Sequence, residues 1–341
     1  MPALGRRGRP PGMVDVARAA GVSQKTVSRV VNNEPYVRPE VRERVLEAAR
    51  HLGYRRNNAA RALISGRSHR IGAVSLGTGL YGPASVLIAL QRAAESAGYS
   101  FVVATTREGE ARAVQQAVDG LLEQGVEGIV LSEPIEEWPE AQVRCPAPVV
   151  SLGRMPGLHG DDILVTGIDG RSAGRRATEH LLSLGHETVW HVAGPRAWYA
   201  ADDRLAGWRE ALEAHDAPVP RVLMGDWMPA SGYAAGRVLA RTGATAVFVA
   251  NDDMAIGVLR ALADAGRRVP ADVSVVGFDD IPAAEYLRPR LTTMRQDFDV
   301  LASTGLDLLV RRLDDLPQSG EATPEVHRLV IRESTGPPRG G

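Results

Sequence analysis

The chain has 341 residues, of which 44% are hydrophobic and 24% charged, a composition typical of globular proteins with two or three domains. Its net charge of −1 conceals an asymmetry, because residues 1–70 carry 15 Lys+Arg against 5 Asp+Glu, a charge of +10, and the remainder carries −11. The single cysteine, Cys145, excludes an internal disulfide, and the chain has neither the ~20-residue apolar run of a membrane helix nor an apolar stretch behind its basic start, so we expect a cytoplasmic protein.

The basic part begins with a stretch that we expect to be disordered, residues 1–12, and continues with three short predicted helices over residues 14–53. Gly21 ends the first helix, Ser23 caps the second, and Pro39 begins the third. In the second helix Val27, Val30 and Val31 recur at the spacing of a buried stripe. Two helices joined by a three-residue turn are typical of a helix-turn-helix.

The exposed face of the second helix holds the only lysine of the chain, Lys25. Ser28 and Arg29 lie on the same face, and Gln24 lies at its flank. In the DNA major groove a lysine donates to guanine and a glutamine pairs with adenine, whereas Ser28 and Arg29 suit phosphate contacts. A small helical bundle with a solvated charged face is the alternative, but the basic charge of this part favours DNA binding.

A short alanine-rich segment, "NNAARALISGR" at residues 57–67, follows the three helices. Asn57 or Asn58 is a candidate helix cap, and Gly66 is a candidate stop. A helix this short is not stable alone in water, where about 12–15 residues are needed. We therefore expect a hinge that becomes helical only when a partner orders it; a plain linker helix is the alternative.

From residue 70 onward, strand-like runs alternate with amphipathic helical stretches, the pattern of a doubly wound α/β fold. Nine such runs are too many for one sheet over a single core, so we expect two Rossmann-like halves with a ligand between them, at the carboxyl ends of the strands. The nine runs lie at residues 70–76, 99–105, 127–132, 147–152, 162–168, 188–194, 221–226, 245–251 and 273–280.

Four side chains suited to a sugar are expected at the ends of different strands: Arg204, Trp227, Asn251 and Asp279. Arginine, asparagine and aspartate provide donors and acceptors for adjacent hydroxyls, and Trp227 offers an apolar face to a sugar ring. Asp279 and Asp280 also raise the alternative of a glycosidase. Two carboxylates adjacent in sequence do not predict the opposed pair, about 5–9.5 Å apart, that hydrolysis requires.

Three further motifs suggest other chemistry. The loop "GTGLYG" (Gly77, Gly79, Gly82) has the spacing of a dinucleotide site and keeps an NADP-binding oxidoreductase open as an alternative, although Pro83 follows its third glycine. The run "GRSAG" at 170–174 has the spacing of a nucleophile elbow, but Asp169 is expected to cap a helix there. His180, His186 and His191 lack the i, i+4 spacing of metal ligands. We expect no metal and no cofactor.

The basic part resembles the DNA-binding head of the lactose-repressor (LacI/GalR) family in "DVARAAGVS", "TVSRVVN" and "LGY". The resemblance implies paired hinge helices that form on the operator, with Leu63 wedged into the minor groove. Gln24 and Lys25 differ from the Tyr-Gln pair of the founding member, so the operator sequence does not carry over. The residues expected to contact DNA are Ser23, Gln24, Lys25, Thr26, Ser28, Arg29, Asn32, Asn57 and Leu63.

The resemblance extends over the remaining chain in "LYGPASVLIAL", "RLAGWREAL", "VANDDMAIGVLRAL", "SVVGFDDI" and "LTTMRQDFDVL". It implies a periplasmic-binding-protein-like core of two subdomains with a sugar pocket. The implied pocket residues are Leu80, Pro83, Val86, Arg204, Trp227, Asn251, Asp279, Gln296 and Phe298. Ala200 stands where a family member has a pocket serine, so the sugar, a β-galactoside or a related glycoside, stays open.

The expected protein is therefore a sugar-responsive transcriptional repressor that binds a palindromic operator as a homodimer. The absence of leucine heptads after the last strand argues against a tetramer. The expected divisions are a helix-turn-helix domain at 13–56, the hinge at 57–67, the effector-binding and dimerisation core at 68–336, and a disordered tail at 337–341.

Overall fold

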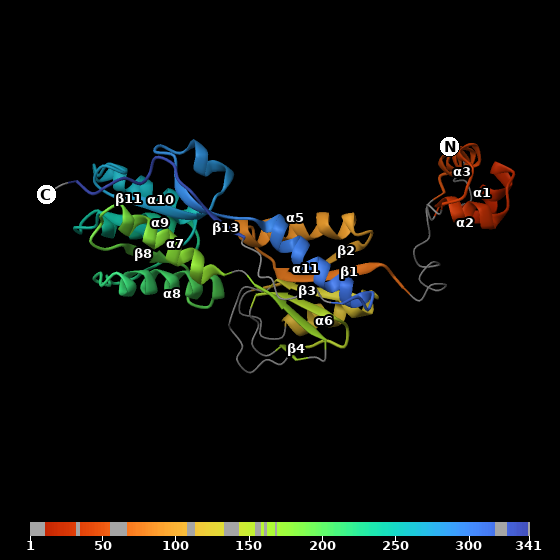
Figure 1. Cartoon of the computed structure of the whole chain (residues 1–341), viewed down its shortest axis with the longest axis horizontal. Helices are drawn as coiled ribbons and strands as arrows, with labels where there is room; N and C mark the ends of the chain where they lie inside the picture. Colours follow the sequence, from red (N-terminus) through yellow and green to blue (C-terminus); the bar gives the residue numbers. More distant parts are fainter. Residues whose placement is uncertain are drawn as a thin grey trace, which may run out of the picture. The chain divides into compact units, whose positions relative to one another are not determined.

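The computed structural model describes residues 11–31, 35–54, 67–107, 113–132, 143–153, 158–159, 162–167, 169–317 and 326–339 (Figure 1). The chain divides into two compact units, residues 1–68 and 69–341. The predicted hinge lies outside the described residues except for Arg67. Of the tail from residue 337, the structure places residues 337–339, and Arg339 lies 2.9 Å from the carboxylate of Asp272. None of the described helices is long and apolar enough to cross a membrane.

The first unit contains three helices, α1 (Met13–Ala20), α2 (Gln24–Val31) and α3 (Pro39–His51). Gly21 adopts the left-handed conformation that ends α1, with a φ of 63°. The Ser23 hydroxyl accepts a hydrogen bond from the backbone N–H of Thr26, 3.1 Å away, and so caps α2. Val27 and Val30 are buried against α1 and α3, and Val31 is half-buried. The predicted helix-turn-helix is confirmed.

The second unit begins with a parallel five-stranded sheet in the order β2-β1-β3-β5-β7, called here the first subdomain with its helices. Helices α5 and α11 cover one face and α6 the other (Figure 1). Strand β1 is buried from both sides and is accordingly apolar almost throughout. The elements are β1 (Arg70–Leu76), α5 (Tyr81–Ser96), β2 (Ser100–Thr106), α6 (Ala113–Glu123), β3 (Gly128–Ser132), β5 (Val149–Leu152), β7 (Ile163–Thr166) and α11 (Phe298–Leu313), with a small separate pair, β4 (Val143–Arg144) and β6 (Leu158–His159).

The second subdomain contains a six-stranded sheet in the order β13-β12-β11-β10-β8-β9, in which only β13 is antiparallel. Helices α7 and α8 pack together on one face, and α9 and α10 pack together on the other. The elements are α7 (Gly170–Ser183), β8 (Trp190–Ala193), α8 (Tyr199–Ala214), β9 (Leu223–Met224), α9 (Pro229–Leu239), β10 (Ala246–Val249), α10 (Asp252–Asp264), β11 (Ser274–Asp279), the 3₁₀ turn η1 (Pro282–Tyr286), β12 (Thr292–Gln296) and β13 (His327–Val330). The predicted fold, a helix-turn-helix with two Rossmann-like halves, is confirmed.

Sequence reading missed strand β12, which the apolar pattern does not reveal. Its first two residues, Thr292 and Thr293, are fully buried although they are polar. The N–H of Thr292 donates to the Ser334 hydroxyl, and the Thr293 hydroxyl donates to the Asp252 carboxylate, so these groups are satisfied inside the core. A strand stabilised in this way has no alternation of apolar and polar residues to detect.

The chain passes between the subdomains directly after strand ends. One passage follows β7 and leads to Asp169, the cap of α7, and another follows β12 and leads through Asp297, the cap of α11. Both caps accept a hydrogen bond from a backbone N–H of the first helical turn, from Ser172 and Val300 respectively. These passages place strand ends and helix starts from both subdomains around one region.

Glycine allows α9 and α10 to pack with their backbones in contact. A Cβ atom at Gly257 would lie 2.0 Å from the carbonyl oxygen of Pro229, whereas one at Gly243 would meet nothing within 4 Å. We expect Gly257→Ala to lower the free energy of unfolding by about 1–3 kcal/mol through overpacking, and Gly243→Ala to leave it nearly unchanged. Urea denaturation of the two variants measures this, and equal stabilities would contradict the packing described.

Candidate ligand-binding site

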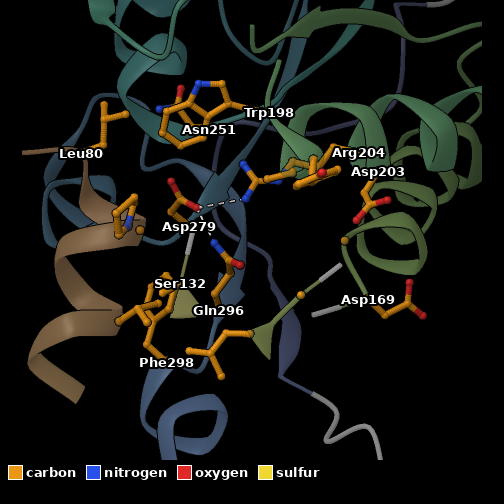
Figure 2. A pocket seen from close by; sticks show the side chains of 18 of the residues that line it. Leu80, Ser132, Asp169, Trp198, Asp203, Arg204, Asn251, Asp279, Gln296 and Phe298 are labelled. Carbon is orange, nitrogen blue, oxygen red and sulfur yellow. Dashed lines mark hydrogen bonds and ion pairs between the residues drawn. The ribbon is translucent and has the colours of Figure 1, made fainter. Parts of the chain in front are cut away.

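A cavity of about 440 Å³ lies between the two subdomains, at the carboxyl ends of strands from both sheets (Figure 2). This volume is within the range of about 300–1,000 Å³ that is usual for small-molecule sites. All nine residues that the sequence predicted for the pocket line this cavity: Leu80, Pro83, Val86, Arg204, Trp227, Asn251, Asp279, Gln296 and Phe298. Their role in binding a ligand stays a prediction.

Arg204 reaches the cavity from a helix. The prediction that it lies at a strand end is wrong, because it occupies the second turn of α8. Its guanidinium donates a hydrogen bond to the carbonyl of Ala250, just after β10. The same group lies 3.7 Å from the carboxylate of Asp279 and stacks on the Phe278 ring, 3.7 Å from the ring centre. One helical side chain therefore contacts the ends of two neighbouring strands.

Asp279 is the acceptor at the centre of the polar wall. Its Oδ1 atom accepts a hydrogen bond of 2.6 Å from the Gln296 side chain, which comes from the end of β12. Burial raises the pKa of Asp279 to about 6, against the opposing effects of the Arg204 charge and the Gln296 hydrogen bond. Burial also disfavours the charged form of Arg204 and so lowers the pKa of its guanidinium, and the Asp279 charge opposes this shift. Near neutral pH the pair is ionised, and the carboxylate has capacity to accept further hydrogen bonds.

Asn251 connects the cavity to the start of α10. Its Oδ1 atom accepts from the N–H of Met254, 3.0 Å away, and caps the helix. Its Nδ2 atom donates to the carbonyl of Trp227, also at 3.0 Å. Trp227 has a φ of 71°, which a tryptophan rarely adopts, so this hydrogen bond holds an uncommon backbone conformation.

Trp227 presents a narrow surface to the cavity, because only 4% of the residue is exposed. Its ring meets Trp198 edge to face, with ring centres 5.6 Å apart and planes at 69°. The same ring lies so close to the backbone of Gly194 that a Cβ atom there would be 2.2 Å from it. The two tryptophans therefore form a rigid corner of the cavity.

The first subdomain supplies an apolar wall opposite the polar one (Figure 2). Leu80 directly precedes α5, and Pro83 and Val86 lie in its first two turns. Phe298, the first residue of α11, meets Tyr81 edge to face with ring centres 6.0 Å apart. A ligand in the cavity would thus contact the polar groups and the tryptophan corner of the second subdomain, and mainly apolar groups of the first.

Sequence reading missed several lining residues. Ser132 closes β3 and could have been found by the strand-end rule that pointed to Asp279. Trp198, which directly precedes α8, has no comparable signal in the sequence. The others include Val165, Asp169, Tyr199 and Asp203. Ala200, which the sequence placed at the pocket, does line the cavity and has no hydroxyl to offer.

The remaining motifs have structural explanations. Ser172 lies in the first turn of α7, where its backbone N–H donates to the Asp169 cap at 2.8 Å, as expected. His180, His186 and His191 bond to different partners, namely Thr335, the Thr245–Ser274–Gly336 group and the carbonyl of Phe248. Over the described ranges, no group of three His, Cys, Asp or Glu side chains is arranged to hold a metal ion.

The first unit presents a candidate DNA interface along α2. Gln24, Lys25 and Arg29 are exposed, and Ser28 is half-buried. The hydroxyls of Ser23 and Thr26 lie 2.9 Å apart. Asn32, Asn57 and Leu63, also predicted to contact DNA, lie outside the described residues.

Two family models match the chain. Residues 12–57 match the model described as bacterial regulatory proteins, lacI family, and residues 178–335 match a periplasmic binding protein-like domain. The first match covers the helix-turn-helix unit, and the second covers most of the second subdomain.

Known proteins are similar over nearly the whole chain. The lactose operon repressor of Escherichia coli (strain K12) is 35% identical over 308 residues, which cover 89% of this chain and 85% of the repressor. A crystal structure of the lac repressor dimer bound to operator and the anti-inducer ONPF superposes with a TM-score of 0.78 at 31% identity, covering 96% of this chain and 100% of that one. A complex of the transcriptional regulator CelR with cellobiose superposes with a TM-score of 0.66 at 33% identity, covering 95% and 99%.

The raised pKa of Asp279 makes stability depend on pH. In the unfolded chain this carboxyl ionises near pH 3.8, whereas in the folded protein it ionises near pH 6. Its stabilising contribution is therefore complete below pH 3.8 and is lost as the pH rises to about 6. We expect the stability of the natural chain relative to Asp279→Asn to fall by up to about 3 kcal/mol between pH 4 and 6.5.

Urea denaturation of both proteins at each pH isolates this contribution. The comparison is needed because burial lowers the pKa of His191 to about 3 and that of His327 to about 4, which favours the folded state at higher pH in both proteins. A stability difference that does not change over this pH range would contradict the burial of an ionisable Asp279.

Proposed function

The chain belongs to the LacI family of bacterial regulatory proteins, and from this premise we propose that it is a repressor released from a palindromic operator by an uncharged β-glycoside. Members of this family are sugar-responsive transcriptional repressors that bind operator DNA as dimers, and they are not enzymes. The observation that carries the ligand class is the cavity, in which hydrogen-bonding groups and two tryptophans of one subdomain face a mainly apolar wall of the other.

The charges around the cavity favour a neutral ligand. Both lining arginines have carboxylate partners, because Arg204 pairs with Asp279 and Arg171 pairs with Glu210. Asp169 and Asp203 add further carboxylates to the wall. A phosphorylated or acidic sugar would meet more negative than positive charge here, whereas neutral hydroxyls donate readily to carboxylates.

The relatives suggest the kind of sugar. One is named for the lactose operon, and another is solved with cellobiose. Both sugars are β-linked disaccharides of hexoses, so we propose a β-galactoside or a closely related β-glycoside for this chain. The most direct test measures whether lactose, cellobiose or glucose 6-phosphate releases the dimer from a fluorescent operator. Release by the phosphorylated sugar alone would contradict the neutral-ligand proposal.

Release would follow from contacts to both subdomains. A sugar that bridges them favours a closed cavity and shifts the subdomains relative to each other. In the proposed mechanism this shift disfavours the DNA-binding conformation of the hinge segment, residues 57–67. A coupling of about 1–3 kcal/mol between the two sites is enough for such regulation.

The exposed side chain of Lys25 is proposed to read a base. We expect Lys25→Ala to lose about 1–3 kcal/mol of binding free energy on the preferred operator. The loss should be much smaller on an operator in which the base pair that Lys25 reads has been changed. Fluorescence anisotropy at fixed salt on operators selected from random DNA measures this. Arg50→Ala, an exposed cation on α3, serves as the control. A uniform loss across operators would instead make Lys25 a phosphate contact.

Arg204 is proposed to bind the sugar through its planar guanidinium. Arg204→Lys keeps the charge but loses the fork of donors, so we expect sugar affinity to fall at least tenfold, about 1.4 kcal/mol, with operator affinity unchanged. Isothermal titration calorimetry with lactose and cellobiose measures the first, and anisotropy the second. Arg175→Lys, in an ion pair with Glu179 on α7, is the matched control. Unchanged sugar affinity in Arg204→Lys would exclude this role.

A further inference from the structure

The backbone that directs Asp279 into the cavity has an uncommon conformation. Asp279 has a φ of 110° and Asp280 a φ of 56°, so two consecutive residues with side chains lie in the region that favours glycine. Such conformations cost free energy and persist only where surrounding contacts hold them. Some feature of the structure must therefore hold the end of β11 in place.

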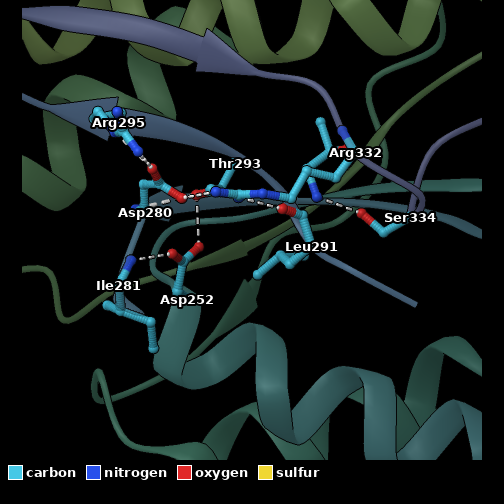
Figure 3. A network of polar contacts seen from close by, with 9 residues as sticks. Asp252, Asp280, Ile281, Leu291, Thr293, Arg295, Arg332 and Ser334 are labelled. Atoms are coloured by element: carbon cyan, nitrogen blue, oxygen red, sulfur yellow. Dashed lines mark hydrogen bonds and ion pairs between the residues drawn. The ribbon is translucent and has the colours of Figure 1, made fainter. Parts of the chain in front are cut away.

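One side chain on the neighbouring helix makes contacts on both sides of this turn. Asp252, the first residue of α10, accepts a hydrogen bond of 2.9 Å from the N–H of Ile281, the residue that follows the turn (Figure 3). Its other oxygen accepts a hydrogen bond of 2.7 Å from the hydroxyl of Thr293 on β12 (Figure 3). The Thr293 oxygen in turn lies 3.4 Å from the N–H of Asp280. Asp252 thus connects α10, the turn and β12.

An acidic residue in the first turn of a helix is usually exposed to solvent, whereas the fold provides a buried space for the Asp252 carboxyl. Asp252 is completely buried, although helix α10 already has its cap in Asn251. A Cβ atom at Gly277 on β11 would lie 2.1 Å from the Asp252 oxygen, so only glycine leaves space for the side chain there. Burying a carboxyl group costs free energy, and the two hydrogen bonds that Asp252 accepts offset that cost.

The second carboxyl of the turn is held from other directions. Asp280 lies between Arg295 on β12 and Arg332, which follows β13, and Arg332 approaches it to 2.7 Å (Figure 3). These ion pairs fix the carboxylate of Asp280. They do not involve Ile281 or Thr293, the two residues that Asp252 holds. The pairing of β11 with β12 reaches Asp279, which lies opposite Arg295, and the hydrogen bonds of Asp252 hold the backbone beyond it, at Ile281.

We propose that Asp252 is a positioning residue for ligand binding, which fixes the turn at Asp279 and Asp280 so that the Asp279 carboxylate faces Arg204, Gln296 and the ligand. Asp252 does not line the cavity and acts through Asp279 alone. For the ligand this proposal rests on the proposed function, whereas for the backbone it stands independently.

The test compares three variants of the full-length protein. Asp252→Ala removes both hydrogen bonds, Asp252→Asn retains an acceptor for Ile281 and a donor to Thr293, and Asp264→Asn changes an ion-paired acid at the other end of α10. We expect affinity for cellobiose or lactose to fall at least tenfold in Asp252→Ala and to stay within threefold of the natural chain in the other two. Operator affinity without sugar should not change in any of them.

A second readout does not require a ligand. In crystals of unliganded Asp252→Ala we expect Asp279 to leave the positive-φ region and its carboxylate to lose contact with Gln296, whereas Asp252→Asn keeps both. If Asp252→Ala does not fold, Thr293→Val removes one of the two hydrogen bonds at nearly constant volume and should shift sugar affinity in the same direction.

Two outcomes would overturn the proposal: an unchanged turn at Asp279 in Asp252→Ala or Thr293→Val, or sugar affinity lost equally in Asp252→Asn and Asp252→Ala. If the natural chain binds neither sugar, the proposed ligand class is wrong, and the crystal structures still decide whether Asp252 positions Asp279.

Discussion

The cavity depends on one buried cation, the guanidinium of Arg204. From α8 it contacts the carbonyl of Ala250 after β10, the carboxylate of Asp279 at the end of β11, and the rings of Phe278 and Trp227. A buried charge of this kind persists only if it is paired and hydrogen-bonded, so the strand ends around it are held in one arrangement. The same constraint leaves the Asp279 carboxylate ionised at neutral pH and directed at the cavity.

The polar contacts behind the cavity extend this arrangement. The start of α10 contributes twice, because Asn251 holds the carbonyl of Trp227 and the next residue, Asp252, holds the N–H of Ile281. Trp227 and Asp279 both have positive φ, and both face the cavity. Backbone conformations that cost free energy are thus concentrated where the ligand is proposed to bind, as is common at functional sites. These residues lower the stability of the fold and in return hold the hydrogen-bond donors and acceptors of the cavity in place before a ligand binds.

Much of this could be predicted from the sequence. The helix-turn-helix follows from Gly21, Ser23 and the valine stripe, because these signals act within a few neighbouring residues. Asp279 followed from the rule that parallel strands place ligands at their carboxyl ends. Arg204 was assigned to a strand end although it lies on a helix, since a long side chain can reach a site that its own element does not predict.

Other features could not be read from the sequence because they depend on distant residues. Thr292 and Thr293 are buried by hydrogen bonds to Ser334 and Asp252, and those partners become visible only in the fold. Trp198 forms part of the cavity wall because it packs edge to face on Trp227, whose own place depends on the missing side chain of Gly194, which is a matter of packing and not of pattern. The resemblance to a family supplied nine of the cavity residues without knowledge of the packing. It gave no indication of Trp198.

The central claim is that Asp279, ionised beside Arg204, accepts hydrogen bonds from a neutral sugar. The most direct test is the affinity for lactose or cellobiose, measured by calorimetry from pH 5 to pH 8. With the pKa of Asp279 at about 6, affinity should be about tenfold weaker at pH 5 than at pH 7, and Asp279→Asn should abolish the pH dependence. Sugar affinity that does not change over this range in the natural chain would contradict the account.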